Sequence, residues 1–183
     1  MKKLILSLIL ISICSFVNAQ TTAVAAAKTS EISNAEKFSD RAGALIQKEF
    51  ITIGTIKKCD IQVMYFTDLI SNQKQSAVRF EYEYKSSYTS DTKVAMLDAD
   101  EVEGLIKSIR LLQTTIASPT VPTNYTEIAF KSRSGFSTGC FSKSNTWSSF
   151  LKLEKFDSNS YVWIDNTDLP TLLTILEEAQ KKM

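Results

Sequence analysis

Polar and apolar residues alternate through the segment 76–87, "SAVRFEYEYKSS". Every second residue from Val78 to Tyr84 is apolar or aromatic, and the residues between them, from Arg79 to Lys85, are charged. A period of two is typical of a β-strand with one buried face. Three neighbouring segments, 44–56, 59–69 and 92–97, are also rich in β-branched and aromatic residues, and short polar breaks separate them. This part of the chain is therefore predicted to form four strands.

The period changes in the segment 98–113, "DADEVEGLIKSIRLLQ". Its apolar residues fall at helical spacing, at Val102, Leu105, Ile106, Ile109 and Leu112, which predicts a helix with one buried face. Asp100 is the predicted N-cap, because Glu103 follows three residues later and completes a capping-box pattern. The first half of the chain is thus predicted to contain four strands and then a helix.

The second half repeats this order. Four predicted strands lie in 125–135, 136–144, 147–156 and 160–165, and a helix follows from about Asp168, with Thr167 as its cap and Pro170 in its first turn. At an offset of 67 residues the two halves align at strand-end and helix-core positions: Met96 with Trp163, Leu97 with Ile164, Asp98 with Asp165, Val102 with Leu169, Leu105 with Leu172, Ile106 with Leu173 and Ile109 with Leu176.

These patterns predict an α+β protein of two ββββα repeats, 44–113 and 125–183, joined by a linker at 114–124 that holds two of the three prolines. A four-stranded antiparallel sheet has one face to bury, and a single helix covers only part of it. We therefore expect a pseudo-twofold pairing of the antiparallel sheets and two helices into one domain, since each repeat can then cover the other.

The N-terminus has the pattern of a secretory signal peptide. Lys2 and Lys3 precede an apolar run from Leu4 to Val17, and small residues end it at Ala19. The run is shorter than the roughly 20 residues that span a bilayer, which disfavours a retained anchor. We expect a signal peptide over 1–19, a flexible leader over 20–43 with a short helical turn around 34–38, and a periplasmic or secreted protein that is not an integral membrane protein.

Charge and composition narrow the function classes. Without Lys2 and Lys3, 19 of the 21 basic residues remain against 20 acidic ones, so no basic excess indicates binding to nucleic acid. The chain contains no histidine, which removes the commonest general base, the histidine-dependent triads and most zinc sites. We expect no catalytic residue, metal or cofactor.

Two cysteines remain after the predicted cleavage site, Cys59 and Cys140. In an oxidising compartment an even number of cysteines favours a disulfide, so this pair is the candidate. The alternative is two separate buried thiols that pack as small apolar side chains.

Three groups of residues are candidates for ligand contacts, each with a structural alternative. Tyr88 and Trp147, near predicted strand ends, are the aromatic candidates, although strand aromatics more often belong to the core. Lys131 and Arg133, in "KSRSGFSTG", are candidates for binding an anion, and the alternative there is a hairpin turn. The acids of "DADEVE", at positions 98, 100, 101 and 103, suit calcium in number, but acids at a helix start also stabilise the helix dipole.

The element order over 44–183 resembles that of the whirly-type and Pur-type single-strand nucleic-acid binders. The resemblance is one of topology, and none of the sequence motifs of those families is present, so it assigns no functional residue here. The segments "LDADEV" and "YTEIAFKSRSG" also resemble exported bacterial proteins of unassigned function.

We therefore expect an exported, non-enzymatic binding or interaction protein whose partner belongs to the envelope or the extracellular space. One alternative is a carboxylate-dependent hydrolase at the cell envelope. A second alternative, from the topology, is a module that binds single-stranded nucleic acid.

Overall fold

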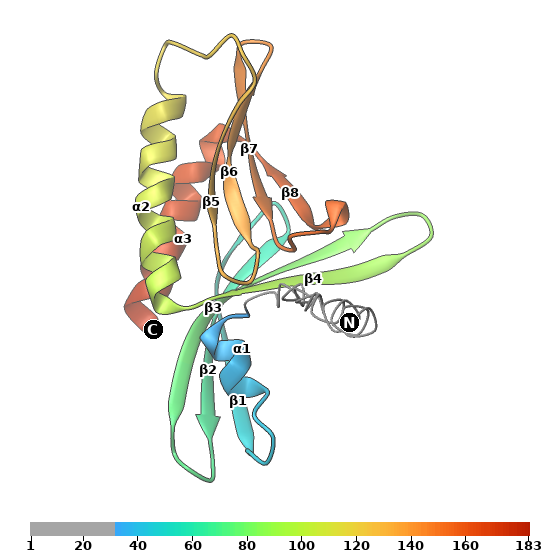
Figure 1. The fold of residues 1–183 in the computed structure, drawn as a ribbon, viewed down its shortest axis with the longest axis vertical. Helices are drawn as coiled ribbons and strands as arrows, with labels where there is room; N and C mark the ends of the chain where they lie inside the picture. The colour runs from blue at the N-terminus through green and yellow to red at the C-terminus, as the bar shows by residue number, and fades with distance from the viewer. Residues whose placement is uncertain (1–31) are drawn as a thin grey trace, which may run out of the picture.

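The computed structural model describes residues 32–183 and contains two four-stranded antiparallel sheets, each followed by a long helix (Figure 1). The first sheet has the order β1 (Ile46–Ile56), β2 (Cys59–Asp68), β3 (Lys74–Lys85) and β4 (Ser90–Leu97), and α2 (Ala99–Ile116) follows it. The second has the order β5 (Thr126–Lys131), β6 (Ser137–Lys143), β7 (Thr146–Lys152) and β8 (Tyr161–Ile164), and α3 (Leu169–Lys182) follows it. The predicted α+β architecture of two ββββα repeats is confirmed.

Both helices pack on a core that the two sheets share. The five predicted apolar positions of α2 are all buried, and α3 buries Leu169, Leu172, Ile175, Leu176 and Ala179. These residues form one cluster with the inner faces of β2, β3, β6 and β7. The rings of Phe80 in β3 and Phe136, which precedes β6, lie 4.7 Å apart and join the two repeats directly. Each sheet is therefore covered partly by the other repeat.

Contacts at the start of the two helices follow the 67-residue offset. The backbone N–H of Asp98 donates to Glu101 Oε2 at 3.0 Å, and the N–H of Asp165 donates to Asp168 Oδ2 at 2.8 Å. Each acid is 67 residues from its counterpart, so the two chain turns that lead from sheet to helix are built in the same way.

Each repeat also forms an ion pair with the residues that precede the helix of the other repeat. Arg133, in the β5–β6 turn, forms an ion pair with Asp98 before α2 at 2.7 Å. Reciprocally, Lys57 in the β1–β2 turn pairs with Asp165 at 2.7 Å and with Asp168 at 3.4 Å before α3. Reciprocal contacts of this kind arise when two similar units are related by a twofold axis.

A short helix, α1 (Asn34–Ser39), covers the outer face of the first sheet (Figure 1). Its Ala35 is fully buried in a small cluster with Met64, Phe66 and Ala77. Part of the leader expected to be flexible is thus packed on the sheet, and its helix lies where a helical turn was predicted. The predicted signal peptide and its cleavage site lie outside the described residues.

Both predicted helix caps are wrong. The N-cap of α2 is Asp98 rather than Asp100, because the Glu101 side chain receives the Asp98 N–H and starts the helix two residues earlier. Thr167 lies inside a short 3₁₀ turn, η2 (Asn166–Asp168), and α3 begins after it, at Leu169. In both places several adjacent polar residues could serve as the N-cap, and contacts with distant parts of the fold determine which one does.

The predicted disulfide is not formed. Cys59 and Cys140 are free, buried thiols that lie in different sheets, at the first residue of β2 and within β6. Burial raises the pKa of Cys59 to about 12 and that of Cys140 to about 11, so both remain protonated at neutral pH. They pack in the shared core as small apolar side chains.

Among residues 32–183, no helix is both long enough and apolar enough to cross a membrane.

Candidate functional site

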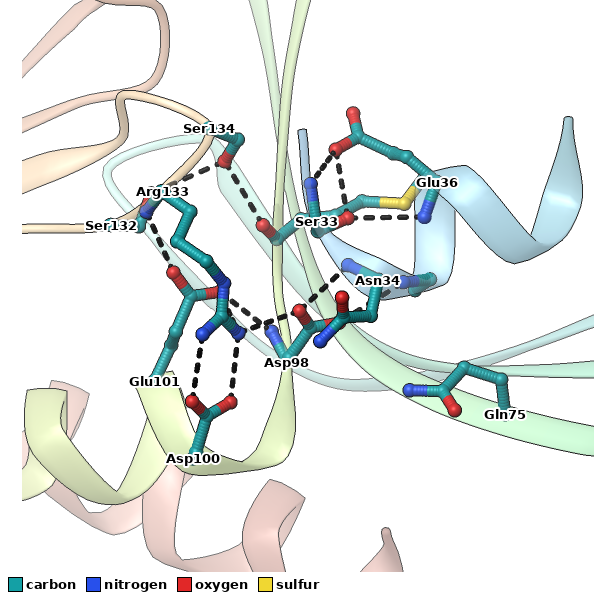
Figure 2. A network of polar contacts seen from close by, with 12 residues as sticks. Ser33, Asn34, Glu36, Gln75, Asp98, Asp100, Glu101, Ser132, Arg133 and Ser134 are labelled. Atoms are coloured by element: carbon teal, nitrogen blue, oxygen red, sulfur yellow. Dashed lines mark hydrogen bonds and ion pairs between the residues drawn. The ribbon is translucent and has the colours of Figure 1, made fainter. Parts of the chain in front are cut away.

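The Arg133 side chain, a predicted anion contact, is already bound by acids of its own chain (Figure 2). Its guanidinium donates to Asp98 Oδ2 at 2.7 Å and to both carboxylate oxygens of Asp100 at 2.8 Å. Its backbone N–H donates to Glu101 Oε1 at 2.7 Å. The hydrogen bond from Arg133 lowers the pKa of Asp100, and the acids raise the pKa of Arg133. Arg133 also lines a cavity at the end of the second sheet, so its predicted contact with an external anion stays a prediction.

This ion cluster instead joins three parts of the fold. The Asp98 carboxylate also accepts the backbone N–H groups of Asn34 at 2.8 Å and Ala35 at 3.1 Å, so it satisfies the first free donors of α1 (Figure 2). The cluster thereby ties α1, the start of α2 and the β5–β6 turn together. No group of three or more possible metal ligands lies close enough to hold an ion in the part of the chain that the structure describes.

One face of the second sheet points away from the helices. We call this surface, which carries Phe141, Phe150, Lys152, Tyr161 and Trp163, the outer face. Strand pairing places its residues in rows. Gly139, Phe150 and Trp163 are paired across β6, β7 and β8, and the next row pairs Lys152 with Tyr161. The neighbouring residues of opposite parity, such as Leu151 and Val162, are buried on the inner face. The outer face therefore combines aromatic rings with a lysine at one end.

Five aromatic side chains form a continuous cluster on or beside this face: Tyr125, Phe141, Phe150, Tyr161 and Trp163. The rings of Tyr161 and Trp163 are stacked, with centroids 5.1 Å apart and planes 6° from parallel. Phe141 meets the Trp163 ring edge-on at 6.0 Å. Trp163 is nevertheless 58% exposed, so the aromatic cluster supports one side of this ring and leaves much of it to solvent.

The repeat shows why this exposure is notable. Met96 occupies the position in the first repeat that Trp163 occupies in the second, and it packs against the cluster that α1 covers. Both residues lie on the outer face of their own sheet. Where the first sheet buries an apolar residue under a helix, the second presents a large aromatic ring to solvent.

A cavity of about 220 Å³ opens at the lysine end of the outer face. Its lining includes the side chains of Lys131, Lys152, Lys155, Phe150 and Tyr161. Gly135, in the left-handed region at φ 97°, shapes it, because a Cβ at this position would lie 2.8 Å from Lys155 Cβ. The β5–β6 turn and the segment after β7 can therefore approach each other closely beside the cavity.

The lysines of the cavity carry free charge. Within residues 32–183, none of Lys131, Lys152 and Lys155 forms an ion pair with a carboxylate. The acids nearest in sequence are engaged elsewhere, since Glu154 and Asp157 pair with Lys93 at 3.7 and 2.5 Å. The hydrogen bond from Lys93 lowers the pKa of Asp157. The cavity is therefore locally positive, although the chain as a whole is nearly neutral.

The structure places the predicted ligand residues in different environments. Lys131 lines the cavity. Trp147 is only 9% exposed and packs in the core, but it also lines a second pocket with Trp163, so its role as a ligand contact stays a prediction. Tyr88 is 95% exposed, but it lies in the β3–β4 turn of the first sheet and does not line this cavity. The stacked pair Tyr161 and Trp163 was not predicted, although its spacing of two residues was a signal for a shared face.

Comparison of the chain with protein-family models, curated proteins and solved structures gives no match. The geometry and charge of the outer face are therefore the basis for inferring function.

Proposed function

We propose that this chain is an exported, non-enzymatic binding protein of the periplasm or the extracellular space, and that it binds its ligand on the outer face. The observation that carries the proposal is the stacked pair of Tyr161 and Trp163, which is exposed beside a cavity with three unpaired lysines. The signal-peptide pattern of the N-terminus supports the cellular location.

The rigidity of this surface supports a binding role. Its aromatic rings lie on adjacent strands rather than on loops, so their positions are fixed before a ligand arrives, which lowers the entropic cost of binding. Exposed aromatic clusters are uncommon on monomeric proteins unless they contact something. Large aromatic side chains also contribute a disproportionate share of binding energy at interfaces.

The arrangement of carboxylates supports binding over catalysis. Glu127 is the carboxylate that lines the cavity, and its Oε2 accepts the Tyr125 hydroxyl at 2.8 Å. A carboxylate-dependent hydrolase of the usual type needs two carboxyl groups across one bond. The other nearby acids, Asp98, Asp100 and Glu101, are held in ion pairs with Arg133.

The experiment is a binding panel with matched surface variants. The purified mature protein is titrated with neutral and acidic polysaccharides, peptidoglycan fragments, anionic vesicles and oligonucleotides. We expect at least one class to bind, and the double variant Tyr161→Ala/Trp163→Ala to lose that binding at least tenfold. Tyr88→Ala is the control, because it removes an even more exposed aromatic ring from the other repeat.

Equal loss of binding in Tyr88→Ala and the double variant would contradict the proposal, as would a ligand that both variants bind normally. Turnover of a panel member, abolished by changing a single carboxylate, would favour the hydrolase instead. Circular dichroism and thermal unfolding establish that each variant is folded.

A further inference from the structure

We infer that the ligand is an acidic polysaccharide, one sugar ring of which packs on Trp163 while a carboxylate or sulfate group of the chain enters the lysine cavity. This inference rests on the proposed function and specifies the ligand class. It joins two neighbouring features, the exposed aromatic ring and the unpaired positive charge, into one site.

The aromatic and charged parts of the site are contiguous. The Lys152 ammonium lies 4.8 Å from the centre of the Tyr161 ring, and Tyr161 is stacked on Trp163 at 5.1 Å. A ligand on the side of Trp163 opposite Tyr161 is therefore separated from the ammonium group by two aromatic rings, those of Trp163 and Tyr161. The complementary molecule has an apolar ring face and an anionic group a few sugar units further along its chain.

The chemistry of the ring contact suits a sugar. The C–H groups on one face of a pyranose ring form an apolar patch with a slight positive charge, which packs well on the electron-rich face of an indole. The hydroxyl groups at the ring edge remain in water or bond to nearby polar groups. One such polar group is the hydroxyl of Ser148, in the strand β7 beside Trp163. Ser148 is paired with Phe141 of β6.

The cavity is suited to a single acidic group. Its volume of about 220 Å³ corresponds to roughly seven water molecules in the liquid, which is the size of one sugar unit rather than of a larger ligand. In the described part of the chain the three lysines form no ion pair, and they outnumber Glu127, the carboxylate that lines the cavity with them. An anionic substituent in the cavity takes the place of the anions that otherwise surround the lysines. Its attraction to the lysines weakens as the salt concentration rises.

The distribution of charge disfavours single-stranded nucleic acid. A nucleic acid carries one phosphate for each base, so its binding grooves have basic residues along their whole length. Here Lys131 and Lys152 lie at one end of the outer face and Lys143 lies at the other, with aromatic rings rather than basic residues between them, and Glu127 adds a carboxylate to the cavity. An acidic polysaccharide needs only one positively charged subsite beside its stacking contact.

The test compares two forms of the same sugar chain. Oligogalacturonate and its methyl ester share the ring and differ in charge, and titration calorimetry measures both with the mature protein. Dextran sulfate with dextran forms a second such pair. We expect the charged member of at least one pair to bind at least tenfold more tightly than the neutral member, with a difference that shrinks as salt is raised.

Lysine variants assign that difference to the cavity. In Lys131→Gln/Lys152→Gln/Lys155→Gln we expect the preference for the charged form to fall at least fivefold. The control Lys74→Gln/Lys107→Gln/Lys181→Gln removes the same net charge from exposed positions elsewhere and is expected to leave the preference unchanged.

Equal binding of charged and neutral forms, with loss in Trp163→Ala, would overturn the acidic-ligand inference and leave the proposed function intact. Absence of binding to any acidic polysaccharide would overturn the inference as well, and so would tighter binding to oligonucleotides or anionic vesicles. An equal effect of the two lysine triples would also contradict it, because non-specific charge would then explain the preference.

Discussion

Arg110 in α2 and Glu177 in α3 form an ion pair, with nitrogen and oxygen 2.6 Å apart. The two residues are 67 positions apart in the chain, the same offset that aligns the halves of the sequence. In a structure with twofold symmetry, equivalent residues close to the axis meet each other. The two helices lie side by side and run in opposite directions (Figure 1), which fits an axis perpendicular to both helices. The contact therefore places the pseudo-twofold axis between α2 and α3.

This ion pair makes a first prediction. Both side chains are substantially exposed, at 59% and 36%, so each single reversal, Arg110→Glu or Glu177→Arg, is expected to cost less than about 1 kcal/mol. The double reversal restores an opposite-charge pair at the same place. Urea unfolding of all four proteins should show that the double variant recovers most of the loss. A double variant whose loss equals the sum of the single losses would show that the contact is absent in solution.

Arg133 is expected to matter far more for stability. Its partners Asp98 and Glu101 have side chains only 4% and 7% exposed, so Arg133→Met leaves buried charge without a partner. We predict a loss of about 3 kcal/mol in the free energy of unfolding. Arg110→Met, which removes an exposed arginine, is the control and should cost less than about 1 kcal/mol. A similar small effect for both variants would contradict the role of the ion cluster.

The same variant has a predicted pH dependence. Arg133 lowers the pKa of Asp100 in the folded protein below its unfolded value of about 3.9. The stability that this shift contributes is therefore fully present above that value and is lost as the pH falls through the folded pKa. The difference in unfolding free energy between wild type and Arg133→Met should be nearly constant between about pH 7 and pH 5 and should narrow as the pH falls from about 4 to about 2. A difference that does not narrow below about pH 4 would rule out the linkage.

The sequence pattern was sufficient for the architecture because burial follows periodicity. The five apolar positions of α2 all enter the core, and the strand alternation around Val78 and Phe80 matches their burial. The cap of α2 was assigned wrongly because Asp98 and Asp100 are both suitable N-caps, each with a glutamate three residues later. Their roles depend on Arg133 and on α1, which are distant in sequence, and local rules contain no information about such contacts.

The cysteines give a prediction about chemical reactivity. With pKa values raised by burial to about 12 for Cys59 and about 11 for Cys140, the thiolate forms are scarce at pH 8. A thiol-specific disulfide reagent should label neither residue in the native protein within minutes, and both in guanidinium chloride. Intact mass should correspond to two free thiols. Absence of labelling in denaturant, or a mass lower by two hydrogens, would instead indicate the disulfide.

Two glycines should respond in opposite ways to alanine. A Cβ at Gly139 would lie 2.0 Å from the Ile128 carbonyl oxygen, a backbone atom that cannot move without breaking the β5–β6 pairing. Gly139→Ala is therefore expected to cost about 3 kcal/mol or more. Gly104→Ala, inside α2, meets nothing closer than Phe130 Cε2 at 3.4 Å and should stabilise the protein by about 0.5–1 kcal/mol. Thermal and urea unfolding test both, and a tolerated Gly139→Ala would contradict the strand register.

The outer face was harder to predict than the fold for a physical reason. In "SYVWID" both sets of alternating residues are apolar, Val162 with Ile164 and Tyr161 with Trp163, so periodicity alone cannot tell which set faces the core. Trp147 was preferred to Trp163 because it lies near a predicted strand end, and in the structure Trp147 faces the core while Trp163 is exposed. Lys131 was recognisable as a charged residue next to a turn, but its neighbours in the cavity come from β7 and the segment after it, and only the fold brings them together.

The central claim, that the outer face of the second sheet binds the ligand, is tested most directly by mapping. Backbone amide shifts of ¹⁵N-labelled protein are recorded during titration with the tightest ligand of the panel. The account predicts that the largest shifts fall on β6, β7 and β8 and around Lys131 and Lys155, with α2 and α3 unaffected except near β8. Shifts confined to the helices, to β1 or to the β3–β4 turn around Tyr88 would contradict it.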